Sequence, residues 1–370
     1  MQPTPAADDR VFPPRQLPSR PRPQRQNRRE TPAYDLSSML ASRGPITRVA
    51  SMPNMFGDSL FRQQLTIANF AQSTTYDLPP IGGIRNLKIA DNSKALPTDR
   101  AYFTYHHFQN ALEVFNWGTG TQAFSLDRYT VGAEKTFVDG LWSVELRLPF
   151  TAAPRLSIGL IQNDNQNVDN LTIIAKRLVY SGEQTVVAVG LALNLPTAGN
   201  VTGVGGVSNY TLHNDAVHLA PFIGFARTPT DRFFYQGFLQ ADVAANGSVI
   251  EFNNTQIGVL NEQSLLYVDA ATGYWFYRDP TAGFLKGLAG LLELHYTTTL
   301  EDADSVSGND GSNLLTLGNL ANRIDLLHLT VGLQAEVGMT SFSIGAVLPV
   351  QEDSYRVCDA EVQVFVNRRF

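Results

Sequence analysis

The chain has 370 residues, of which 43% are hydrophobic and only 17% are charged, and its formal net charge is −6. Soluble proteins carry about 25% charged residues, so this composition lacks the charges that usually cover a cytosolic enzyme. The single cysteine, Cys358, excludes a disulfide framework and a cysteine-based zinc site, and no apolar run is long enough for a transmembrane helix.

The first third of the chain differs from the rest in composition. Residues 1–33 are rich in proline and arginine and nearly devoid of apolar residues, which predicts a disordered tail that serves as a spacer or contacts a polyanion. No secretory signal is recognisable there, so export would require a signal that is not present in this chain. Residues 34–99 are more apolar but are interrupted by prolines and glycines. They predict an irregular region, either a plug or a periplasmic collar.

From residue 100 to the end, apolar and polar residues alternate with the period of a β-strand. In one segment, Trp142 and Leu146 fall on one face, whereas Glu145 and Arg147 fall on the other. Several segments exceed ten residues, which suits a membrane barrel better than a soluble sheet. The first and fourth segments fit either phase. The segments, about twelve in number, are 101–115, 124–137, 140–150, 169–180, 184–195, 214–227, 231–245, 262–278, 283–299, 323–337, 341–351 and 355–370.

The connections between these segments alternate in length. Short turns are followed by longer polar loops, and aromatic residues gather at the segment ends, as they do at the lipid interfaces of a membrane barrel. The sequence therefore predicts an all-β fold for residues 100–370, a transmembrane antiparallel up-and-down β-barrel of about twelve strands. The longer loops lie near 151–168, 196–213, 246–261 and 300–322.

The last strand carries a resemblance to a known signal. The ending V-Q-V-F-V-N-R-R-F has Val362, Val364 and Val366 at alternate positions before the terminal Phe370. It resembles the C-terminal signal that the barrel-assembly machinery reads in bacterial outer membranes, although Arg368 departs from that pattern. The resemblance implies location in the bacterial outer membrane, with its lipids and this machinery as partners.

Two further segments resemble a group of outer-membrane barrels. They read G-L-A-L-N-L-P-T (190–197) and H-L-T-V-G-L-Q-A-E-V-G (328–338). The group is associated with aromatic-degradation pathways and is distantly related to fatty-acid transport channels. This likeness covers two of the twelve segments.

If the apolar phase faces lipid, the polar phase must line the lumen. The expected lumen residues carry both signs of charge, so they predict either a selective channel or a closed, salt-bridged interior. Two aromatic members could guide an amphipathic solute or pack against residues 34–99. The expected lumen-lining residues are Arg128, Glu134, Glu145, Arg147, Arg232, Phe234, Gln236, Phe238, Gln240, Asp242, Glu293, His295, His328, Thr330, Gln334, Glu336, Glu361 and Gln363.

These features favour a porin-like outer-membrane channel for passive uptake of small solutes, with amphipathic or aromatic compounds as candidates. The alternatives are a structural barrel with a closed lumen, a barrel enzyme such as a lipase, and a soluble all-β binding protein. Glu293 and His295 share a strand face, but no histidine has a serine two residues on, as the twelve-strand phospholipase family requires. We therefore expect no enzyme, cofactor, metal or nucleic-acid partner, and the solute is not identified.

Overall fold

The computed structural model describes residues 46–59, 63–69, 73–78, 88–116, 118, 120–152, 168–205, 208–319, 322–350 and 358–370. The tail predicted for residues 1–33 lies outside this part of the chain. Here the single helix is α2 (Ile46–Ala50), and no helix of the described residues has the length and apolar character needed to cross a membrane.

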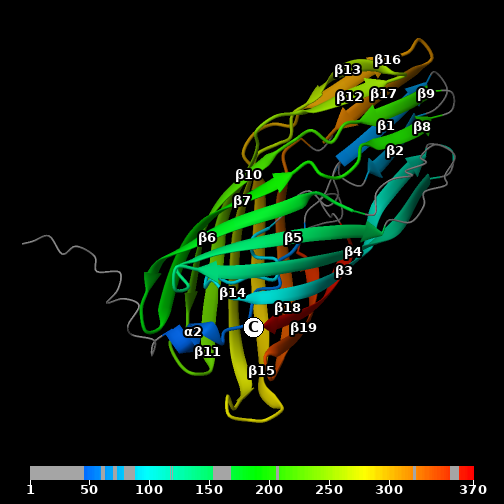
Figure 1. Cartoon of the computed structure of the whole chain (residues 1–370). Helices are drawn as coiled ribbons and strands as arrows, with labels where there is room; N and C mark the ends of the chain where they lie inside the picture. Colours follow the sequence, from blue (N-terminus) through cyan, green and yellow to red (C-terminus); the bar gives the residue numbers. More distant parts are fainter. Residues whose placement is uncertain are drawn as a thin grey trace, which may run out of the picture. The chain divides into compact units, whose positions relative to one another are not determined.

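Twelve long strands form a closed antiparallel barrel (Figure 1). The ring closes because β3 pairs with β20 on one side and with β4 on the other. Each of the twelve predicted segments contains one wall strand, so the predicted fold class is confirmed. The order around the wall is β3 (Arg100–Asn116), β20 (Ala360–Arg369), β19 (Thr340–Pro349), β18 (Asp325–Val337), β15 (Leu285–Thr299), β14 (Leu265–Arg278), β11 (Phe233–Ala244), β10 (His218–Arg227), β7 (Thr185–Leu195), β6 (Leu171–Ser181), β5 (Trp142–Ala152) and β4 (Gly120–Phe137).

The wall strands bury their polar side chains and expose their apolar ones. On β5, Leu146 is 48% exposed, whereas Glu145 and Arg147 are 1% and 2% exposed. A strand directs successive side chains to opposite faces, so one face of the closed sheet is apolar and open while the other is polar and enclosed. This arrangement reverses that of a soluble protein and is typical of a barrel surrounded by lipid.

The ambiguous phase of the first segment has a structural cause. In β3 the register against β4 shifts between Phe108 and Leu112, and Asn110 adopts a φ of 53°. The bulge inserts two unpaired residues into β3, so Ala111 and Leu112 are both buried and the alternation is broken there, although even-numbered positions face inward on both sides of it.

The loops that were expected to be only polar contain short strands. They form β-hairpins at the end of the barrel that we call the loop end; the opposite end, with the short turns, is the turn end. One hairpin pair builds a separate four-stranded sheet, and the other strands extend the barrel sheet beside β3. The loop-end strands are β1 (Gln63–Asn69), β2 (Ser73–Leu78), β8 (Val201–Gly205), β9 (Ser208–Leu212), β12 (Ser248–Phe252), β13 (Thr255–Leu260), β16 (Ser305–Asn309) and β17 (Asn313–Gly318).

The N-terminal region crosses the interior of the barrel twice. Asn54 contacts Asn367 near the turn end (Nδ2–Oδ1 3.4 Å), and Asp58 contacts His328 nearer the loop end (Oδ2–Nδ1 2.7 Å). The chain then forms β1 and β2 at the loop end and returns from Lys88 to the start of β3. Figure 1 shows α2 beside the turns and β1–β2 among the loop strands. We call residues 51–59 the ascending segment and residues 88–99 the descending segment.

Candidate functional site

The barrel interior holds nearly all the residues that the sequence assigned to the lumen. One exception is Arg232, which is exposed in the turn before β11, because that strand begins one residue later, at Phe233. The following are at most 9% exposed: Arg128, Glu134, Glu145, Arg147, Phe234, Gln236, Phe238, Gln240, Asp242, Glu293, His295, His328, Thr330, Gln334, Glu336, Glu361 and Gln363.

A first ionic cluster joins both segments to the wall near the middle of the barrel. Asp58 of the ascending segment and Lys88 of the descending segment form an ion pair (Oδ1–Nζ 2.5 Å). The Nδ1 atom of His295 lies 2.8 Å from Asp269 Oδ1 and 3.6 Å from Asp58 Oδ1. The other carboxylate oxygen of Asp58 lies 2.7 Å from His328 Nδ1, so this buried carboxylate contacts a lysine and two histidines.

The same cluster contains a set of potential metal ligands. Atoms of Asp58, Asp269 and His295 all lie within 4.8 Å of one another. The ammonium group of Lys88, however, lies 2.5 Å from Asp58 and 3.8 Å from Asp269. A tethered cation therefore occupies the position between the carboxylates that a metal ion would take.

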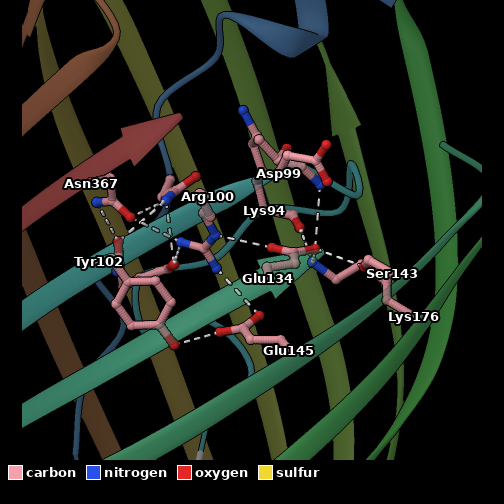
Figure 2. A network of polar contacts seen from close by, with 12 residues as sticks. Lys94, Asp99, Arg100, Tyr102, Glu134, Ser143, Glu145, Lys176 and Asn367 are labelled. Atoms are coloured by element: carbon pink, nitrogen blue, oxygen red, sulfur yellow. Dashed lines mark hydrogen bonds and ion pairs between the residues drawn. The ribbon is translucent and has the colours of Figure 1, made fainter. Parts of the chain in front are cut away.

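A second ionic cluster lies on the wall formed by β3, β4 and β5 (Figure 2). Arg100 bridges Glu134 (Nε–Oε2 2.9 Å) and Glu145 (Nη2–Oε2 3.3 Å). Arg147 also binds Glu145 (2.7 Å), and Lys176 of β6 binds Glu134 (3.2 Å). The charges in this cluster are thus paired and hydrogen-bonded, as buried charges must be.

Wall side chains also hold the main chain of the two segments. Glu293 accepts hydrogen bonds from the backbone N–H groups of Phe56 and Gly57, at 2.9 and 3.0 Å. Gln240 accepts one from Ile89 N–H (2.7 Å), and Lys176 donates to the Lys94 carbonyl (3.0 Å). These contacts satisfy buried peptide groups that have no strand partner.

The interior also holds apolar clusters, interleaved with these polar groups. Phe238 packs in one cluster with Met55 and Ile89, and Phe234 packs in another with Met52 and Trp275. Of the two roles weighed for these phenylalanines, the structure therefore shows packing against the N-terminal region.

The interior is filled in this state. The ionised side chains of the first cluster, Asp58, Lys88 and Asp269, are at most 2% exposed, and those of the second are at most 3% exposed. A water-filled path would leave such groups accessible. Passage of a solute past these clusters therefore requires one of the segments to move.

The histidines facing the interior contact carboxylates. His106 lies 2.6 Å from Glu361 and 3.6 Å from Asp91, and His295 also approaches Glu293 (3.2 Å). In the part of the chain that the structure describes, these histidines are bound by carboxylates rather than by a serine or cysteine side chain that could act as a nucleophile.

Several residues of the two clusters were missed in the sequence. Lys176 lies in the segment that fits either phase, so the alternation did not assign it. Asp269 does follow the inward phase of its strand, with Leu265 and Tyr267, and could have been found from that signal. Asp58 and Lys88 belong to an irregular region without periodicity, and only the structure brings them to the wall.

Comparison with known proteins identifies the fold. No family model matches the sequence, and no curated protein does. An outer-membrane channel from Pseudomonas putida F1 is similar in structure, with a TM-score of 0.50 and 10% identity, covering 75% of this chain and 97% of the channel. The NanC porin has a TM-score of 0.42 and 8% identity, covering 73% and 98%. The toluene transporter TodX of Pseudomonas putida has a TM-score of 0.33 and 9% identity, covering 89% and 92%. At these identities the similarity is one of fold.

Proposed function

We propose that this chain is a channel of the bacterial outer membrane that passes small solutes passively, and that the N-terminal region gates its lumen. The observation that carries the proposal is the closed twelve-stranded wall, apolar and exposed outside and polar inside. A wall of this size can enclose a narrow path. The similar barrel from Pseudomonas putida F1 is an outer-membrane channel, which supports the same role here.

The outer face supports insertion in a lipid bilayer. Large aromatic side chains are exposed at the turn end, among them Trp142 (40%), Phe284 (75%) and Phe342 (48%). Such rings anchor a barrel at the lipid interface. The terminal Phe370 is 60% exposed, so the ending that resembles the assembly signal is accessible to the barrel-assembly machinery.

The two-sided interior supports amphipathic or aromatic solutes. Once the segments move, the second ionic cluster, on β3, β4 and β5, would lie across the ring of strands from Phe238 of β11, which is itself the register neighbour of Asp269 in the first cluster. A solute with one polar and one apolar side can contact both walls, whereas a purely hydrophilic solute leaves the apolar wall unmatched.

Planar-bilayer conductance tests the proposal. All twelve wall strands lie after residue 99, so a variant lacking residues 1–99 keeps the complete wall. We expect little current from the full chain at rest and clear single-channel steps from the truncated variant. A truncated variant that folds, as judged by a heat-dependent shift in gel mobility, but never conducts would overturn the channel proposal.

A structural barrel with a closed lumen is the second candidate. It is favoured by the attachment of the N-terminal region at the loop end, where β1 pairs with β17 and β2 pairs with β3. These ladders oppose withdrawal of the whole region through the barrel. Absence of conductance in both proteins would select this candidate.

A further inference from the structure

A cavity of about 270 Å³ opens at the turn end, beside the ascending segment. With roughly 30 Å³ per water molecule in the liquid, it has room for about nine waters or one small organic molecule. Four wall strands (β14, β15, β18 and β20), two turns and the residue after α2 line it. The lining residues are Ser51, Arg278, Pro280, Lys286, Glu336, Gly338, Met339 and Arg369.

Positive charge dominates this cavity. Three lining side chains are cationic, and Glu336 is the single carboxylate among the lining residues, already paired with Arg369 (Nη2–Oε1 2.5 Å). Arg278 donates to the Asp231 carbonyl and to the Ser51 hydroxyl, and neither acceptor is charged. The ammonium group of Lys286 has no hydrogen-bond or ion-pair partner among the described residues, whereas its carbonyl accepts from Asp279 N–H (2.8 Å).

We propose that this cavity binds a small anion, a carboxylate or a phosphate. Two cations without a carboxylate partner, Arg278 and Lys286, face a space in which a single anionic group can meet both. Hydrogen bonds between ionised groups are roughly twice as strong as neutral ones, so an anion competes well for Arg278 against a hydroxyl and a carbonyl. The size of the cavity excludes large polyanions.

Anion binding is coupled to the ascending segment. The side chain of Arg278 holds Ser51, and Arg369 donates to the Ala50 carbonyl (3.4 Å). These contacts fix the turn end of the segment. An anion that takes over Arg278 releases Ser51, so occupation of the cavity favours the undocked segment, and undocking favours binding in return.

Anion binding does not depend on the proposed channel function, whereas the effect of the anion on gating rests on that function. Calorimetry on the full chain in neutral detergent tests binding directly, with benzoate and inorganic phosphate as probes and benzylammonium as the charge-reversed control. We expect both anions to bind and benzylammonium not to bind. Failure of both anions to bind, or equal binding of benzylammonium, overturns the proposal.

Matched variants locate the site. Lys286→Met should weaken benzoate binding at least fivefold. Lys135→Met removes a cation from the same end of the barrel but outside the cavity, and should leave binding within twofold of wild type. An equal loss of benzoate affinity in both variants would mean that general surface charge attracts the anion, and would overturn the assignment of the site to this cavity.

Two further measurements ask whether the bound anion is a lipid headgroup and whether its binding releases the ascending segment. Vesicles containing phosphatidylglycerol, compared with phosphatidylcholine alone, show whether a lipid headgroup competes with benzoate; competition identifies the lipid as a source of the same anionic chemistry. Amide exchange should rise at residues 51–55 when benzoate is bound. Binding without conductance would refute the channel and retain the site, whereas binding without increased exchange would refute the coupling.

Discussion

The docking of the ascending segment depends on a glycine pair in the wall, and a Gly332→Ala variant tests this directly. Gly332 of β18 and Gly345 of β19 are register partners, and the ring of Phe56 lies against both. A Cβ atom added at Gly332 would lie 2.2 Å from Phe56 Cε2, and one added at Gly345 would lie 2.8 Å from Phe56 Cδ1. In the variant, the ring of Phe56 must therefore move away from Gly332 and Gly345.

The loss of docking free energy in Gly332→Ala follows from the buried contacts that Phe56 gives up. Its side chain is 1% exposed, and burial of such a ring contributes about 1.5–3 kcal/mol. The adjoining hydrogen bonds from Phe56 and Gly57 N–H to Glu293 are strained when the ring shifts. We expect docking of the segment to weaken by about 2–3 kcal/mol, in line with overpacked cores. At a factor of ten per 1.4 kcal/mol, amide exchange at Phe56 and Gly57 should accelerate about 30- to 150-fold.

Gly203→Ala is the matched control. Its Cβ would lie 2.2 Å from the ring of Tyr210, but both residues belong to the separate four-stranded sheet at the loop end, so Phe56 and Gly57 should exchange as in wild type. A Phe56→Ala/Gly332→Ala double variant should cost less than the sum of its parts, because the new methyl group enters vacated space. Unchanged exchange in Gly332→Ala, or equal acceleration in Gly203→Ala, would refute the proposed contact between Phe56 and the two glycines.

Other perturbations probe the membrane face, the ionic cluster and the buried lysine. Val331→Arg, on the exposed face of β18, should destabilise folding in lipid by about 2–4 kcal/mol, whereas Leu300→Arg beyond a strand end should cost about 0–1 kcal/mol; a reversed order would invert the assigned faces. Asp58→Asn removes the closer of the two carboxylates of the buried Lys88 and should cost about 3–5 kcal/mol in the same titration, whereas Asp302→Asn in an exposed pair should change little. Lys94 of the descending segment donates to the carbonyls of Ala50 and Met52 (2.8 and 3.3 Å). Lys94→Met should therefore lower the protection of the amides of the ascending segment against exchange, and unchanged protection would show that these contacts do not hold it.

Alternation alone determines where most wall strands lie. On β5, Glu145 and Arg147 follow each other at the strand period, so their burial is readable from the sequence. The alternation is broken at a bulge, as near Asn110 in β3, where Ala111 and Leu112 are both buried, although the inward phase of Phe108 resumes at Leu112. Turn residues also limit prediction from alternation. Arg232 continues the alternation of β11, but it precedes the first ladder pair of that strand and is exposed.

Contacts of the N-terminal region could not be predicted in the same way. Phe56 can pack against the wall because Gly332 and Gly345, on different strands, are register neighbours. No local sequence pattern reveals this pairing. Likewise, Asp58 and Lys88 are 30 positions apart and meet only because the intervening chain turns at the loop end. Long-range placement of an irregular segment depends on the closed wall around it.

The two crossing segments differ in how they are held, and this difference determines how the lumen can open. The descending segment runs directly into β3 at Arg100, so its turn end is continuous with the wall. The ascending segment is attached at the loop end through β1, but its turn end is held by side chains: Arg278 binds Ser51, Arg369 and Lys94 donate to the Ala50 carbonyl, and Met52 is buried. These contacts are weaker than a β-ladder, so opening should begin at the turn end of the ascending segment and proceed toward Phe56. The cationic cavity lies at that point, so an anion bound there acts on the part of the interior that is easiest to move.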